Sequence, residues 1–318
     1  MVRSRVMRFR SIQTLILFMA AANAADTSFP SAEIKSRAIT AKLYLPNAEK
    51  GYYRGTRFDW SGNTYSLRTK NHEYFGQWFP KYDPNLHDAI MGPAEEFKTT
   101  EGGLGYELAK PGETFVRIGV GVVRRPDTEP FQAFKTYEIV HHGRWQVKRR
   151  SNSITFVHDL VGPNGYAYRY TKTMRLVKDQ PRMLIEHSLR NTGAKRIQAQ
   201  QYNHNFFVMD GQPSGPDSWV KFPFDLHPVR PFTGDVGKTK GGEIAIRANC
   251  SKARACSASS ADLEKPRPTM TLEWRTVKPA QGSASAATGR WRRLFSGLFA
   301  LCFVPNLTSI SMSSRARS

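Results

Sequence analysis

Residues 166–177 read YAYRYTKTMRLV, a run of aromatic and β-branched residues that alternate with a period of two. Ile39, Ala41, Leu43 and Leu45 likewise share one face of an expected strand. Similar runs occupy residues 115–123, 137–140, 154–160, 183–190 and 197–209, with turn residues such as Gly162-Pro163-Asn164-Gly165 between them. No segment has a long helical period. The sequence therefore predicts an all-β chain folded as a large antiparallel β-sandwich.

The formal net charge of +21 is unevenly distributed over the 318 residues. Residues 1–25 carry an excess of four basic residues, residues 26–246 an excess of eight, and residues 247–318 an excess of nine. More than half of the excess lies outside the expected sandwich, so we expect no nucleic-acid partner. His141, His142, Arg144 and Lys148 indicate either a solvated basic loop and strand end or a polyanion site.

The N-terminus has the pattern of a secretory signal peptide. Four arginines precede an apolar stretch at residues 15–22, and Ala22-Asn23-Ala24 fits a cleavage site after Ala24. An uncleaved N-terminal helix is the alternative interpretation. No other apolar stretch reaches the roughly 18 residues that a membrane span needs. We therefore expect export to the periplasm or the extracellular space, without a stable membrane span.

Cysteine and histidine spacing indicates no metal site and no disulfide framework in the main domain. The three cysteines, Cys250, Cys256 and Cys302, all lie in the last quarter of the chain. His72, His158, His187 and His227 have no metal-ligand spacing. A glycine-rich nucleotide motif is also absent from the sequence, so we expect neither a metal nor an organic cofactor.

Two short segments point to sugar chemistry: residues 86–92, LHDAIMG, and residues 203–207, NHNFF. A histidine within a polar triplet and beside aromatic rings provides a proton donor next to a flat apolar surface. Both segments resemble the aldose 1-epimerase (galactose mutarotase-like) family, as does GYYRGTRF at residues 51–58. The resemblance extends from about residue 39 to about residue 242. It implies a supersandwich fold and the interconversion of α and β anomers of a hexose.

Opening a cyclic hemiacetal needs a base at the anomeric hydroxyl and an acid at the ring oxygen. His204 is the candidate acid, because an imidazole with a pKa near 6.5 donates and recovers a proton near neutral pH. The alternative is a core histidine that caps a strand end. Asn203 next to it is a candidate sugar contact.

Three further residues are candidates for sugar binding. The resemblance implies that His87 contacts sugar hydroxyls, and a surface histidine beside Asp88 is the alternative. Arg57 offers paired hydrogen bonds to vicinal hydroxyls, or else is a solvated strand residue. Trp78 offers an aromatic face for stacking, or else belongs to the core. Glu95 and Glu96 are neighbours, and neighbouring strand residues point to opposite faces, so they form no acid/base couple.

The chain changes character after residue 246. Residues 247–318 are rich in Ala, Ser and Arg and lose the strand alternation, which predicts either a disordered tail or a displaced reading frame. Codons can be chosen for residues 246–318 so that a frame two bases on runs without a stop and contains the segment CPEPY. The resemblance places the general base in such a segment, where this chain has Val304, Pro305 and Asn306. We therefore expect the C-terminal strands and the base to be lost; Glu273 is a conceivable substitute.

These observations together define an organisation and a function. We expect a signal peptide at residues 1–24, a galactose mutarotase-like sandwich at residues 25–246 and a non-native-looking or disordered tail at residues 247–318. The expected partner is a hexose or related small sugar, and the oligomeric state is open. The alternatives are a non-catalytic carbohydrate-binding or accessory module of the same fold, a phosphosugar epimerase, and a truncated sandwich that folds badly.

Overall fold

The computed structural model describes residues 29–70, 72–99, 102–211, 218–221, 225, 228–230 and 237–246, and five strands between residues 256 and 315. Every strand pair is antiparallel. The described residues contain no α-helix, only single-turn 3-10 helices at Pro163–Gly165 and Met209–Gly211. The predicted all-β, antiparallel class is therefore confirmed.

Three sheets contain most of the strands that precede residue 200. The first has the order β1-β2-β3, the second β11-β10-β9-β8 and the third β5-β6-β7. Their bounds are β1 (Ser31–Lys35), β2 (Thr40–Tyr44), β3 (Asn63–Arg68), β5 (Thr114–Arg117), β6 (Gly121–Arg124), β7 (Ile139–His141), β8 (Arg144–Arg149), β9 (Ser153–Val161), β10 (Ala167–Leu176) and β11 (Met183–Asn191).

Two further sheets contain the remaining strands. One has the order β14-β17-β20-β21-β12-β4 and the other β15-β16-β13-β18-β19. Their bounds are β4 (Gly92–Lys98), β12 (Gln200–Phe207), β13 (Ser218–Lys221), β14 (Pro228–Arg230), β15 (Gly237–Lys240), β16 (Glu243–Ile246), β17 (Cys256–Ser260), β18 (Met270–Thr276), β19 (Ala287–Arg293), β20 (Phe299–Val304) and β21 (Leu307–Arg315). The sequence also predicted that residues 247–318 come from a displaced reading frame and replace the native C-terminal strands. Both statements concern the origin of this segment and stay predictions.

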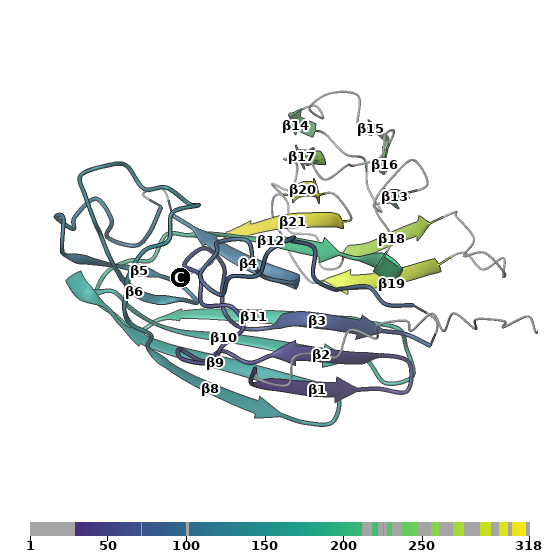
Figure 1. Cartoon of the computed structure of the whole chain (residues 1–318), viewed down its shortest axis with the longest axis horizontal. Helices are drawn as coiled ribbons and strands as arrows, with labels where there is room; N and C mark the ends of the chain where they lie inside the picture. Colours follow the sequence, from purple (N-terminus) through teal and green to yellow (C-terminus); the bar gives the residue numbers. More distant parts are fainter. Residues whose placement is uncertain are drawn as a thin grey trace, which may run out of the picture.

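The sandwich forms because β4 and β12 lie across the inner face of the four-stranded sheet. Figure 1 shows β8 to β11 as a curved layer along the lower side of the view, with β4 and β12 above it. Between these layers, Phe97 of β4 packs edge-on against Tyr170 of β10, in a cluster with Leu160 and Tyr168. Burying such aromatic area is the dominant stabilising term for a sheet pair.

The run at residues 115–123 forms two strands instead of the single strand that its apolar pattern suggested. β5 and β6 pair with each other across a tight turn at residues 118–120. Gly119 has φ of +79°, and a Cβ on it would lie 2.8 Å from the Cβ of Asp59. The turn therefore requires glycine both for its backbone conformation and for its close approach to the neighbouring segment.

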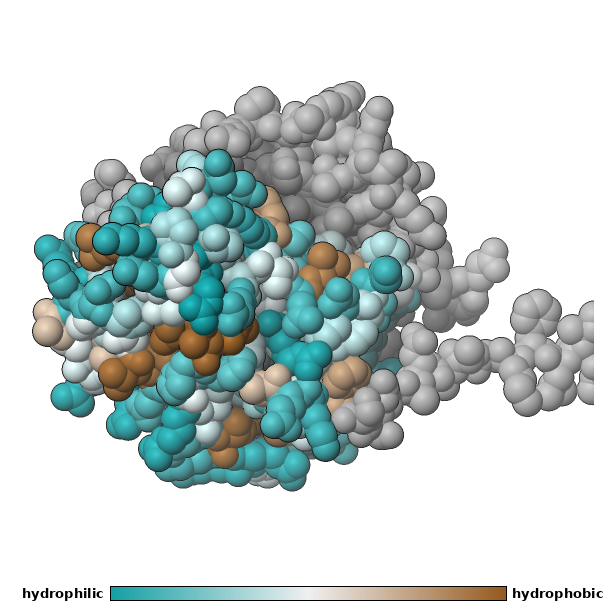
Figure 2. All heavy atoms as spheres, turned by 60° about the vertical axis from the view of Figure 1, so that its left-hand side comes forward, coloured by the Kyte–Doolittle hydropathy of each residue, from teal (hydrophilic) through white to brown (hydrophobic). Residues whose placement is uncertain are grey.

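The surface at one end of the molecule is mostly hydrophilic. Figure 2 shows hydrophobic side chains there in small separate patches. Among the described residues, the exposed large hydrophobic side chains are Leu86, Leu108, Phe134, Val140, Val147 and Val161. No helix in the described part of the chain is both long and apolar enough to cross a lipid bilayer.

His158 of β9 makes the stability of the sandwich dependent on pH. Its ring lies flat on Trp145, with the centroids 4.1 Å apart, and Nε2 lies 2.9 Å from the carbonyl oxygen of His142. Burial is the main cause that lowers the pKa of His158 to about 4 from its ordinary value of 6.5. As the pH falls, His158 therefore becomes protonated at a higher pH in the unfolded chain than in the folded protein.

We expect the free energy of unfolding to decrease by about 2 kcal/mol between pH 7 and pH 5 through His158 alone. Stability that depends on a neutral imidazole is present above pH 6.5 and is lost as the pH falls towards 4. Urea unfolding at pH 7, 6 and 5 measures it. His158→Gln should flatten the pH dependence, and His141→Gln, which replaces an exposed and minor contributor to the lowered pKa of His158, should change it little. Equal slopes for the wild type and His158→Gln would contradict the assignment.

Candidate functional site

Glu96 and His204 occupy the same face of two paired strands. β4 and β12 are antiparallel, with Ala94 opposite His204, and residues two apart on a strand share a face. The Nε2 atom of His204 lies 4.0 Å from Oε2 of Glu96, and both side chains are nearly fully buried. This face of β4 and β12 is therefore the floor of the candidate site.

Arg57 links this floor to the loop that carries His87. Its Nε donates a 2.9 Å hydrogen bond to Oε2 of Glu96, and its Nη1 pairs with Oδ1 of Asp88. The guanidinium carbon lies 4.6 Å from the ring centroids of both Phe58 and Phe134. One planar cation thus joins two carboxylates and is held by two aromatic rings, the arrangement for which guanidinium is suited.

His87 completes a continuous row of polar groups. Its Nδ1 lies 3.1 Å from Oδ2 of Asp88, and its ring meets the exposed Phe134 edge-on with centroids 5.0 Å apart. We call His87, Asp88, Arg57, Glu96 and His204 the polar row. Side-chain exposure falls along it from 26% at His87 and Asp88 to 10% at Arg57 and 3% at Glu96. One end therefore reaches solvent and the other lies in the core.

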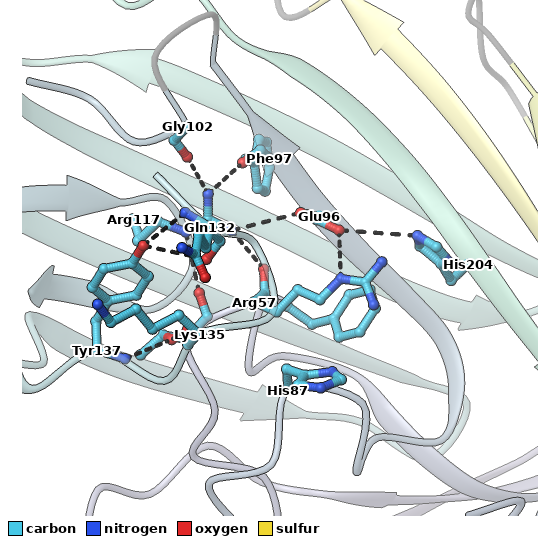
Figure 3. A network of polar contacts seen from close by, with 12 residues as sticks. Arg57, His87, Glu96, Phe97, Gly102, Arg117, Gln132, Lys135, Tyr137 and His204 are labelled. Atoms are coloured by element: carbon cyan, nitrogen blue, oxygen red, sulfur yellow. Dashed lines mark hydrogen bonds and ion pairs between the residues drawn. The ribbon is translucent and has the colours of Figure 1, made fainter. Parts of the chain in front are cut away.

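Arg117 also contacts the polar row. Figure 3 shows its guanidinium beside Glu96, which lies between Arg57 and His204. Nη2 of Arg117 lies 3.8 Å from Oε1 of Glu96 and donates a 2.9 Å hydrogen bond to the carbonyl oxygen of Arg57. Two cations thus hold Glu96 as a hydrogen-bond acceptor of fixed orientation.

His204 is enclosed by aromatic rings. Phe206 stacks on it at 14° with centroids 5.6 Å apart, and Phe58 meets it edge-on at 5.1 Å. Trp78 stacks on Phe206 at 4.7 Å and donates its indole N–H to the carbonyl oxygen of Ile90 at 2.8 Å. Trp78 therefore lies against the aromatic floor, and its predicted contact with a sugar stays a prediction.

The sequence argument for His204 used an ordinary imidazole pKa, and the structure changes that premise. Burial first, and the positive charge of Arg57 second, lower the pKa of His204 well below 6.5. The ring is therefore neutral at neutral pH. A neutral imidazole still donates a hydrogen bond and polarises a sugar oxygen, but it transfers a proton less readily than an imidazolium ion.

Sequence reasoning placed Arg57, His87, Trp78 and His204 in one site, and the structure brings all four together. It had treated Asp88 and Glu96 as neighbours or structural acids and had not considered Arg117 and Phe134. Asp88 follows His87 directly in the sequence, and this adjacency could have identified it as a residue of the candidate site. The side chains of Asn203, Glu273 and Val304, together with Pro305 and Asn306, lie outside the described part of the structure. In the described part of the chain, no group of three or more His, Cys, Asp or Glu residues is arranged to hold a metal ion.

The hydroxyl of Tyr53 ties the two site loops together. It accepts a 3.1 Å hydrogen bond from the backbone N–H of Phe58 and donates a 2.9 Å hydrogen bond to the carbonyl oxygen of His87. Burial raises the pKa of Tyr53, so the hydroxyl keeps its proton. It thereby fixes the distance between the segments that carry Arg57 and His87.

Tyr53→Phe is expected to lower the free energy of unfolding by about 1 to 3 kcal/mol, because it removes the hydrogen bonds of a buried N–H and of a partly buried carbonyl. Tyr52→Phe is the matched control, since the buried Tyr52 hydroxyl has no hydrogen-bond partner among the described residues. That control should change stability by less than about 0.5 kcal/mol. Urea unfolding measures both variants, and equal losses would refute the bridging role.

With this geometry described, comparison with known proteins adds similarities of fold. No model of a protein family matches the chain, and no curated protein sequence matches it. Three solved structures are similar in fold. A galactose mutarotase-like protein from Lactobacillus casei is 13% identical, with 89% of this chain and 87% of that chain covered at a TM-score of 0.43.

The other two belong to Lactobacillus acidophilus and Clostridium acetobutylicum. The first, a galactose mutarotase related enzyme, is 10% identical, with 90% of this chain and 86% of that chain covered at a TM-score of 0.44. The second, a galactose mutarotase-like protein, is 12% identical, with 89% and 84% covered at a TM-score of 0.43.

Proposed function

We propose that this chain binds a hexose or a related sugar at the polar row and interconverts its α and β anomers. The single observation that supports the proposal is the convergence of Arg57, His87, Glu96 and His204 beside aromatic rings. Fixed donors and acceptors beside apolar rings are what a sugar ring, with its hydroxyls and apolar face, requires. The proposal includes export after cleavage near Ala24, which the mass of the secreted chain tests.

In this proposal His204 donates a hydrogen bond to the ring oxygen of the sugar, and Glu96 and Arg57 orient the imidazole. His87 and Asp88, at the solvent end, contact hydroxyls. The glutamate base implied by the family resemblance is missing from its expected position. Because a general acid or base contributes about 10² to 10⁴ in rate, turnover is expected to be slower by a factor in that range.

A second candidate function is sugar binding without turnover, in an accessory role. Two observations favour it: Glu96 is held by two cations, and burial keeps His204 neutral. A neutral imidazole transfers a proton to the ring oxygen less readily than an imidazolium ion does, and Glu96 is held in ion pairs. The two candidates share the binding site and differ only in catalysis.

Polarimetry on freshly dissolved α-glucose and α-galactose distinguishes the candidates, with calorimetric titration of the same sugars alongside. We expect the wild type to accelerate mutarotation above the spontaneous rate and His204→Gln to lose about 10²-fold or more of that acceleration. His141→Gln, exposed and distant in sequence from the polar row, serves as the control. Binding without acceleration supports the second candidate, and absence of both binding and acceleration refutes the sugar site.

A further inference from the structure

The outer face of the four-stranded sheet is a second surface with a distinct chemistry. Alternation along β9 and β10 sends Phe156, His158, Tyr168 and Tyr170 into the core. The alternate residues therefore point outwards, on the side of the lower layer in Figure 1 that faces away from β4 and β12. They are partly or fully exposed, and they are Arg144, Gln146, Lys148, Ser153, Thr155, Val157, Asp159, Val161, Arg169, Thr171, Thr173, Arg175, Leu184, Glu186, Ser188 and Arg190.

One cross-strand row on this face contains three arginines and one carboxylate. The strand registers align Arg190, Arg169, Asp159 and Arg144 across β11, β10, β9 and β8. We call this set the arginine row. Arg169 lies directly opposite Arg190, and like charges in that position destabilise a sheet. Asp159 lies opposite both Arg169 and Arg144, so sheet stability accounts for those two arginines but gives no reason for Arg190 beside Arg169.

The carboxylate in the row is already engaged. Asp159 accepts hydrogen bonds of 2.6 and 3.0 Å from Nε and Nη2 of Arg169, while Nη2 of Arg144 lies farther away at 3.9 Å. One acid thus faces three guanidinium groups, and it forms a bidentate pair with Arg169 only. Because neighbouring strands are about 4.8 Å apart, Arg144 and Arg190 are separated by roughly 14 Å across the sheet. The two outer guanidinium groups can therefore contact successive charges on an extended anion.

The rest of the face adds positive charge and hydroxyl groups. Five basic residues (Arg144, Lys148, Arg169, Arg175 and Arg190) face only two acids, Asp159 and Glu186. Hydroxyls lie between them, and the side chains of Thr155 and Thr173 are joined by a 3.0 Å hydrogen bond. The surface is therefore a flat field of guanidinium and hydroxyl groups with a net positive charge.

We infer that the outer face of β8 to β11 binds an acidic polysaccharide through the arginine row. Guanidinium groups pair bidentately with carboxylates and sulfates, and serine and threonine hydroxyls exchange hydrogen bonds with sugar hydroxyls. The outward positions include no aromatic residue, so the face lacks the stacking platform that single-stranded nucleic acids use. Its large apolar side chains, Val157, Val161 and Leu184, are few and stand among charged and hydroxyl groups, so the face is not the apolar surface that inserts into a membrane. This inference is independent of the hexose site on the other layer.

The test uses the full chain with heparin as the sulfated probe and polygalacturonate as the carboxylated probe. We expect wild-type binding to weaken as salt rises, because counterions compete for the arginines. The double variant Arg144→Gln/Arg190→Gln should reduce affinity for at least one probe by tenfold or more, with Arg169 and Asp159 left paired. The matched control is Arg68→Gln/Lys110→Gln, which removes the same charge from exposed residues outside this sheet and should stay within twofold of the wild type.

Three results would overturn the inference. Absence of binding to both polysaccharides in 0.1 M salt would show that an acidic polysaccharide is not the partner of this face. Equal losses in the two double variants show that net charge, and not the arginine row, is responsible. Tighter binding to oligo(dT) or to anionic phospholipid vesicles than to either polysaccharide identifies a different class of partner. Thermal unfolding of both variants checks that the sheet is intact, and calorimetry with hexose reports the other site separately.

Discussion

Replacement of Lys172 by methionine is expected to lower the free energy of unfolding by about 3 to 5 kcal/mol, more than any other single change considered for this chain. The Lys172 side chain is completely buried, as are Asp59 and Glu95 beside it. Its ammonium group pairs with Glu95, donates a 2.7 Å hydrogen bond to the carbonyl oxygen of Ser61 and lies 3.4 Å from Asp59. Methionine would leave two carboxylates in the core without this cation.

The protonation of Asp59 gives this prediction a pH signature. Burial raises the pKa of Asp59, and Lys172 is the main influence that opposes the rise. Without Lys172 the pKa rises further, so the folded variant holds a proton that the unfolded chain releases. Stability that depends on this proton is present at low pH and is lost as the pH rises. The deficit of Lys172→Met should therefore be smaller at pH 5 than at pH 8.

Urea unfolding of three variants separates charge from packing. Lys178→Met, at an exposed position two residues beyond β10, should change stability by less than about 0.5 kcal/mol. The triple variant Lys172→Met/Glu95→Gln/Asp59→Asn should recover much of the loss, because it removes the unpaired charges together with the cation. A loss below about 1 kcal/mol in Lys172→Met would show that the buried cluster is not coupled to folding.

Alternation of residues predicted strands whose inward residues are mainly apolar, including β10 with its single buried lysine, and failed at β4. The runs at residues 154–160 and 183–190 correspond to β9 (Ser153–Val161) and β11 (Met183–Asn191). β4 was missed because its centre is Glu95-Glu96, a pair that resembles exposed sequence. Both acids are buried, on opposite faces, and their cationic partners Lys172 and Arg57 lie 77 and 39 residues away. A local sequence pattern cannot show that a buried carboxylate is paired with a cation so far away along the chain.

The same limit applied to the candidate site. Arg57, His87 and His204 stood out because each lies in a segment with a recognisable chemistry. Glu96 and Arg117 acquire their roles only from contacts across sheets, since Arg117 of β5 supports the backbone of Arg57 from 60 residues away. The pKa of His204 was likewise inaccessible, because burial and the proximity of Arg57 are properties of the fold. Sequence therefore named residues that the structure brings together, and the contacts between them come from the fold.

Arg57→Lys is expected to weaken hexose binding at least about tenfold and to lower the free energy of unfolding by about 2 kcal/mol. The guanidinium contacts Glu96 through Nε and Asp88 through Nη1, and it lies between Phe58 and Phe134. A lysine keeps the charge but has a single ammonium group, which cannot bond both carboxylates in this geometry. Asp88 and His87 would then lose their fixed position relative to His204.

Arg54→Lys is the matched control, because Arg54 lies on the same loop and its Nη1 bonds the backbone carbonyl of Glu49 instead of a carboxylate. Calorimetric titration with the hexose that the wild type binds, together with urea unfolding, measures both variants. If Arg57→Lys loses stability but binds the sugar as tightly as Arg54→Lys does, Arg57 supports the fold and the sugar contacts lie elsewhere. If Arg57→Lys instead loses affinity for the hexose while its stability is nearly unchanged, Arg57 has little effect on folding. The guanidinium then positions Asp88 and Glu96 for the ligand.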